Sequence, residues 1–164
     1  MNLLQAIQTR RSVSKVADKP VDRNLIQQLL DYAAMAPNHK NTAPWRFRVF
    51  SADERFALAT ACATGDPDKT DFWREKVQRA PVIIGVASFA GRSKADIPVW
   101  EEHAATAAAC QNMLLAAHAL GLGAIWRSGK ITEKAEVQNL FNGFDASKSD
   151  QVMAFIYIGW PLEN

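Results

Sequence analysis

The chain has 164 residues, of which 48% are hydrophobic and 22% are charged. This length favours one domain, and the composition is that of an ordinary globular protein, which excludes a disordered or collagen-like chain. The formal net charge is only +2, too small an excess for an extended nucleic-acid-binding surface. No apolar stretch is long enough to predict a transmembrane helix.

Helices dominate the prediction for the first half of the chain. Residues 3–9 predict a short helix, and a second helix begins at the N-cap residue Asp22 and is ended by Pro37. Apolar residues and arginines alternate over 45–50, which predicts a half-buried strand. Two further helices are predicted over 52–63 and 70–79.

The second half contains the predicted centre of the fold. Residues 82–89 are almost all apolar, as in a central strand. Glu101–Leu120 predicts a long alanine-rich helix that is buried or lies in an interface. A strand over 124–128, a helix over 132–141 and a strand over 152–158 follow. These interspersed elements predict an α+β fold with a central mixed sheet flanked by helices, in one domain over residues 1–164.

Several common functional motifs are absent from the sequence. The two cysteines, Cys62 and Cys110, have no CxxC spacing, and no Cys/His cluster predicts a metal site. Gly121-Leu-Gly123 follows a helix and lacks a third glycine, so it is a helix cap and not a dinucleotide-binding loop. The N-terminus has no signal-peptide pattern, so we expect a cytoplasmic protein.

Three local clusters are candidates for binding an anionic, planar ligand, with a solvated arginine pair and a plain turn as the alternatives for the first two. Arg10, Arg11 and Ser12 offer two guanidinium groups and a hydroxyl, a combination that can hold a phosphate. Residues 36–45 form a stiff loop with a proline near each end and polar side chains between them. The third cluster offers an aromatic wall beside cations and consists of Trp126, Arg127, Ser128, Gly129 and Lys130.

Together these clusters resemble the FMN-dependent nitroreductase family, in particular its small NAD(P)H-dependent branch. The Arg-Arg-Ser cluster is similar to the opening motif of the family. The loop is similar to its Ala-Pro-Ser-x-x-Asn-x-Gln-Pro-Trp pattern. It matches that pattern at Ala36, Pro37, Asn41, Pro44 and Trp45.

The resemblance implies a nitroreductase fold and a homodimer with two FMN molecules in pockets made by both subunits. Arg10, Arg11, Ser12, Trp126, Arg127 and Ser128 of one subunit would bind FMN, and His39 and Asn41 would come from the partner subunit. NAD(P)H would donate hydride, and a nitroaromatic compound, a quinone or a similar acceptor would receive it by a ping-pong mechanism. The flavin would carry the chemistry, with no catalytic side chain and no metal.

The sequence departs from the family pattern at three places. Ala43 stands where the family has Gln, Met35 stands where close relatives often carry Arg, and the chain ends at Asn164, before an expected C-terminal arm. These departures leave open a non-catalytic flavin-binding or flavin-storage module. A nucleic-acid-binding module is a third alternative, suggested only by Arg46 and Arg48 beside aromatic residues.

Overall fold

The structure is a computed structural model that describes residues 1–94 and 96–162. Ala95, Glu163 and Asn164 lie outside the described residues. The expectation that the chain ends at Asn164, before a C-terminal arm, therefore also lies outside them. The helices are α1 (Leu3–Thr9), α2 (Arg23–Ala33), α3 (Glu54–Ala63), α4 (Thr70–Val77), α5 (Val99–Ala119) and α6 (Ala135–Gln138), and the strands are β1 (Trp45–Ser51), β2 (Val82–Phe89), β3 (Gly123–Arg127) and β4 (Asp150–Gly159).

Most boundaries agree with the prediction within two residues. The side chain of Asp22 caps α2 as expected, because it accepts a hydrogen bond of 2.7 Å from the N–H of Asn24. The helix predicted over 132–141 is wrong in extent, since Lys134 has an extended backbone and only α6 follows as α-helix. The Lys134 ammonium donates to the carbonyl of Cys62 near the end of α3, a contact that anchors this extended residue to α3.

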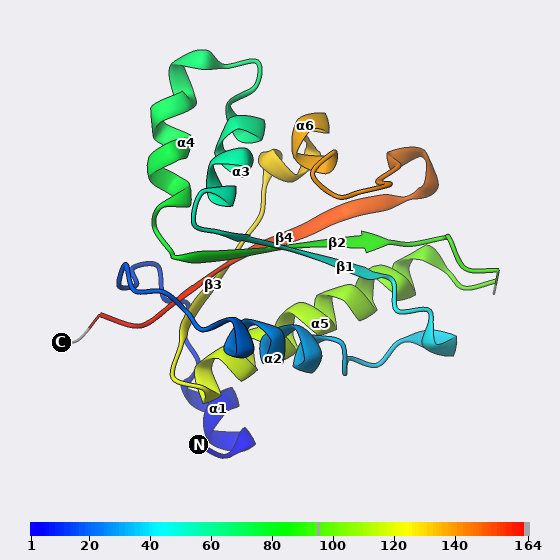
Figure 1. The fold of residues 1–164 in the computed structure, drawn as a ribbon. Coiled ribbons are helices and arrows are strands. Elements are labelled where there is room, and N and C mark those ends of the chain that lie inside the picture. The colour runs from blue at the N-terminus through cyan, green and yellow to red at the C-terminus, as the bar shows by residue number, and fades with distance from the viewer. Residues whose placement is uncertain (95, 163–164) are drawn as a thin grey trace.

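The four strands form one sheet in the order β1-β2-β4-β3 (Figure 1). The α+β class is confirmed, but all three strand pairs are antiparallel, whereas a mixed sheet was expected. The connection between β1 and β2 explains part of this difference. Helices α3 and α4 pack together and return the chain to the end of the sheet that it left, so that Ser51 pairs with Val82.

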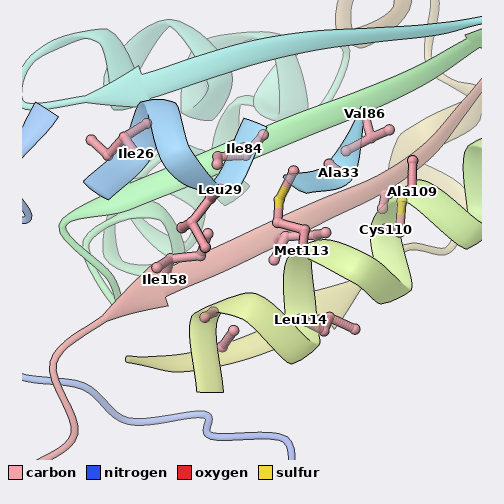
Figure 2. Close-up of a cluster of buried hydrophobic side chains, with 14 of the residues drawn as sticks. Ile26, Leu29, Ala33, Ile84, Val86, Ala109, Cys110, Met113, Leu114 and Ile158 are labelled. Atoms are coloured by element: carbon pink, nitrogen blue, oxygen red, sulfur yellow. The ribbon is translucent and has the colours of Figure 1, made fainter. Parts of the chain in front are cut away.

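Helices cover both faces of the sheet (Figure 1). All eight residues of β2 are buried, as the apolar run predicted. Ile84 and Val86 face α2 and α5, where they join Leu29 and Met113 in one core (Figure 2). The alternate residue Ile83 packs into a second core with α3 and α6.

Helix α5 is buried along one side only. Ala109, Cys110, Met113 and Ala117 have no exposed surface, and their small or flexible side chains pack against α2 and the sheet. On the opposite side, the small or polar residues Ala104, Gln111 and Ala119 are exposed. The expectation of a central helix is confirmed, and its other side is left without a covering element among the described residues.

Two glycines allow the N-terminal segment to cross the sheet edge closely. A Cβ atom at Gly159 would lie 2.6 Å from Cγ2 of Val16 and 2.8 Å from Cδ of Pro81. A Cβ atom at Gly123 would lie 2.9 Å from Cγ1 of Val13. The side chains of Val13, Val16 and Pro81 can therefore lie directly on the strand backbone only because these two positions have no Cβ atom.

We expect Gly159→Ala to destabilise the protein by about 1–3 kcal/mol, because stiff neighbours must move to admit the methyl group. Urea unfolding measures this as a lower midpoint with an unchanged slope. A midpoint equal to that of the wild type would show that Val16 can move at no cost.

Candidate functional site: two half-sites on one chain

The N-terminal segment, which carries the first predicted cluster, contacts β3, the strand that carries part of the third. Arg10 ends α1, donating its backbone N–H to Ala6 O at 3.0 Å. The N–H of Val13 then donates to Ala124 O at 3.0 Å, and Val16 pairs with Pro161. Residues 10–12 therefore directly precede the point where the chain meets β3, the strand that ends with Trp126 and Arg127 and is followed by Ser128. We call this arrangement the arginine half-site.

The two neighbouring arginines of this half-site have different surroundings. Arg11 donates through Nη1 to the carbonyls of Gln8 at 2.8 Å and Arg10 at 2.9 Å, so it satisfies carbonyls at the end of α1. Arg10 is half-buried, and the side chain of Ser12 is exposed beside it. Arg10 is thus better placed than Arg11 to bind a ligand.

Trp126 and Arg127 project from opposite faces of β3, because successive strand residues alternate. Trp126 packs against the core that contains α5. The guanidinium carbon of Arg127 lies 5.3 Å from the ring centre of Tyr157, and its Nε is buried without a hydrogen-bond partner among the described residues. Burial raises the pKa of Tyr157 to about 12, so its hydroxyl stays protonated at neutral pH. Ser128 is exposed directly after the strand.

The loop between α2 and β1 has a strained backbone. Lys40, Asn41 and Ala43 have positive φ angles of 52°, 54° and 45°. The side chain of Asn38 holds this shape, because its Oδ1 accepts from the N–H of Ala43 at 2.9 Å. Non-glycine residues with positive φ cluster at functional sites, so this geometry supports the prediction that the loop binds a ligand.

This loop faces the first turns of α5. Nδ1 of His39 lies 2.8 Å from Oε2 of Glu101. An open groove of about 440 Å³ lies between the loop and α5, and its walls also include Trp100. We call His39, Asn41 and this groove the histidine half-site.

The two half-sites lie at opposite ends of α5. Glu101, in the first turn of α5, contacts His39, whereas His118, in the last turn, contacts Thr9 through Nε2 and Oγ1 at 2.8 Å. His118 follows Glu101 by seventeen helical steps, which is about 25 Å at the rise of an α-helix. One chain therefore does not bring His39 and Asn41 to Arg10.

A largely apolar surface, interrupted by Gln111 and Asn112, connects the two half-sites. It follows the exposed side of α5 and also includes exposed residues of α1 and α2. We call it the α5 face. Its members, at helical spacing or lining the grooves beside α5, are Trp100, Ala104, Ala108, Leu115, Ala119, Leu3 and Tyr32. An exposed apolar surface of this kind is typical of a protein interface.

Neither cysteine is suited to nucleophilic or redox chemistry. Burial raises the pKa of Cys62 to about 11 and that of Cys110 to about 12, so both remain thiols at neutral pH. Within residues 1–94 and 96–162, no group of three His, Cys, Asp or Glu side chains is arranged to hold a metal. No helix in these ranges is long and apolar enough to cross a membrane.

Burial of His103 makes the stability of the folded protein depend on pH. Its Nδ1 is buried without a hydrogen-bond partner in the described part of the chain. Burial lowers its pKa below the ordinary 6.5, and the charges of Glu102 and Asp150 only partly oppose this effect. The unfolded chain therefore binds a proton at a higher pH than the folded chain, and stability is lost as pH falls through that window.

We expect the urea midpoint to fall between about pH 7 and pH 5, and to fall less steeply in His103→Gln. Urea titrations at several pH values measure both slopes. Equal slopes in the two proteins would contradict this role of His103.

The half-sites consist of residues that the sequence singled out as candidates, but the sequence did not indicate the side chains that contact them. Glu101 and His118 are 62 and 109 residues away from their partners in the chain. The one signal that was available is their position at the two ends of a predicted long helix.

Comparisons with known proteins identify the family. The nitroreductase family model matches residues 7–160. "Putative NAD(P)H nitroreductase YdjA" of Escherichia coli is 34% identical over 98% of this chain and 89% of its own length.

Solved structures support the same assignment. A "nitroreductase-like family protein" from Bacillus cereus superposes with a TM-score of 0.85 at 26% identity, over 99% of this chain and 87% of that one. A "putative nitroreductase in complex with FMN" from Desulfovibrio desulfuricans gives a TM-score of 0.77 at 34% identity, over 99% and 88% of the two chains. The α+β fold, the paired arginine and loop motifs and these matches agree, and the chain belongs to the nitroreductase family.

Proposed function

We propose that this protein is an FMN-dependent oxidoreductase that passes hydride from NAD(P)H to a small organic acceptor, such as a nitroaromatic compound or a quinone. Family membership supports this proposal, as do the NAD(P)H nitroreductase name of one relative and the FMN complex of another. FMN, when bound, supplies the hydride chemistry, and the chain supplies binding, orientation and electrostatics. No side chain has to act as a general acid or base.

We further propose that the protein is one domain over residues 1–164 and acts as a homodimer with two shared flavin sites. The observation that favours this most is the separation of the half-sites by the α5 face. A two-fold axis through that face would bring the histidine half-site of one subunit to the arginine half-site of the other. Each pair of half-sites would then form one pocket.

The residues of the arginine half-site fit an anionic, planar cofactor. Arg127 carries a buried Nε–H that lacks a partner in the described structure, and an oxygen acceptor of the cofactor would satisfy it. Arg10 adds a second cation, and Ser12 and Ser128 add exposed hydroxyl groups. Trp126 projects from the opposite face of β3 and packs against the core that contains α5, so it does not line the same side of the strand as Arg127.

Steady-state kinetics test the proposed reaction. The purified protein, loaded with FMN, should oxidise NADH or NADPH in the presence of a quinone or a nitroaromatic compound. Double-reciprocal plots should show parallel lines, because donor and acceptor use one face of the flavin in turn. Converging lines would contradict the ping-pong mechanism, and FMN binding without turnover would favour a flavin-storage module.

We also propose that the protein works in the cytoplasm. Both cysteines are buried and free in the structure, as a reducing compartment allows. Cell fractionation with an antibody to the protein tests this.

A further inference from the structure

We propose that Glu101 is a positioning residue that fixes the hydrogen-bonding role of His39. In this proposal the Nδ1–H of His39 donates to the Glu101 carboxylate, and Nε2 of His39 presents a lone pair to a donor group of the cofactor. The inference rests on the proposed function, because it assigns a task to a side chain outside the residues expected to touch FMN.

When the imidazole is neutral, its contact with an ionised carboxylate determines which nitrogen carries the proton. Oε2 of Glu101 lies 2.8 Å from Nδ1 of His39, a hydrogen-bond distance. An ionised carboxylate can only accept, so Nδ1 must donate. A neutral imidazole has one N–H, and Nε2 is therefore left as an acceptor.

An acceptor nitrogen restricts what His39 can bind. It suits an N–H or O–H group, such as the imide N–H of the flavin ring or a hydroxyl of the ribityl chain. It does not suit a phosphate or carbonyl oxygen, which would need a donor. The structure thus predicts that His39 contacts a donor group and leaves the phosphate to the arginines.

The surroundings of the pair favour a role in binding over a role in stability. The side chains of His39 and Glu101 are 50% and 30% exposed, and one hydrogen bond between solvent-accessible side chains adds little to folding. The pair lines the open groove of the histidine half-site, on the strained loop that Asn38 holds in place. Removing Glu101 should therefore free the imidazole without unfolding the chain.

The first test is the tautomer of His39 in the FMN-free protein. Long-range proton–nitrogen NMR at mildly alkaline pH should show His39 protonated at Nδ1 in the wild type. Glu101→Ala should shift it toward the Nε2-protonated form, which is the more common one in solution. A wild-type His39 protonated at Nε2 would overturn the proposal, whether or not FMN binds.

The second test is the affinity for FMN, measured by quenching of flavin fluorescence. Glu101→Ala should weaken binding about 3- to 10-fold, the effect of one hydrogen bond. Glu101→Gln keeps a carbonyl acceptor and should restore most of the affinity. Glu54→Ala is the matched control, since Glu54 also stands in the first turn of a helix, α3, on the other side of the sheet.

A double-mutant cycle shows whether Glu101 acts through His39. The loss caused by Glu101→Ala should vanish in a His39→Ala background. An additive loss would show that Glu101 acts directly or through general electrostatics, and would overturn the proposal. If the wild type binds no FMN, the proposed function fails, while the tautomer measurement still decides the role of Glu101.

Discussion

Replacing Tyr32 by glutamate should convert the protein to a monomer and weaken FMN binding by at least about 100-fold. Tyr32 lies on the α5 face, where it lines a groove with Leu3 and Leu115. In a two-fold interface each substitution occurs twice, so two unpaired carboxylates would be buried at a cost of about 3–5 kcal/mol each. Loss of the partner would also remove the histidine half-site from each pocket.

Phe72→Glu is the matched control for this variant. Tyr32 is 48% exposed and Phe72 is 46% exposed, but Phe72 lies on α4, which covers the opposite face of the sheet (Figure 1). The control should remain a dimer that binds FMN. Sedimentation velocity and flavin titration measure both properties, and a Tyr32→Glu monomer with full FMN affinity would contradict a shared pocket.

Arg127→Ala should lose most of its FMN on a desalting column. We expect Arg127 to bind the phosphate end of FMN, where its buried Nε–H lacks a partner in the described structure. Removing one member of such a charged pair typically costs about 2–5 kcal/mol. Any FMN that the variant retains should keep a near-native reduction potential.

Arg10→Ala should show the opposite pattern. We expect Arg10 to lie at the edge of the flavin ring that becomes negative on reduction, so its loss should make the potential more negative, by about 30 mV for each 1.4 kcal/mol. This variant should retain more FMN than Arg127→Ala. Arg74→Ala removes an exposed arginine of α4 and serves as the control for both. The reverse pattern, found by potentiometry and flavin titration, would show that the two roles are exchanged.

Local patterns predicted most of the fold. The apolar run of β2 and the N-cap of α2 depend on neighbouring residues, so both could be inferred from the sequence. The antiparallel pairing of β1 with β2 could not be inferred, because it depends on the end of the sheet to which α3 and α4 return the chain. The break at Lys134 was missed for a similar reason, since its partners Cys62 and Thr64 are about seventy residues away.

The two arginines of β1 show how structure separates alternatives that a sequence leaves open. Arg46 donates to the carbonyls of Ala43 and Trp45 and lies 5.3 Å from the ring centre of Phe89. Arg48 donates to the carbonyl of Leu140 and lies 5.1 Å from the ring centre of Phe50. Both guanidinium groups contact the protein itself, which favours a structural role on a half-buried strand over nucleic-acid binding.

Helix α5 connects the parts of the expected shared pocket. This helix packs on the sheet through one side, displays the α5 face on the other, and contacts one half-site at each end through Glu101 and His118. A single element would thus set the distance between the half-sites and the interface that pairs them.

Subunit complementation tests the shared pocket most directly. One subunit carries Arg127→Ala, the other carries His39→Ala together with Asn41→Ala, and heterodimers are purified through two different affinity tags. If the half-sites of a pocket come from different subunits, the heterodimer has one intact pocket and one doubly defective pocket. It should bind one FMN per dimer and turn over NAD(P)H, although each variant homodimer binds FMN poorly. If both half-sites came from the same subunit, every pocket in the heterodimer would be defective, and a heterodimer as poor as the homodimers would contradict the account.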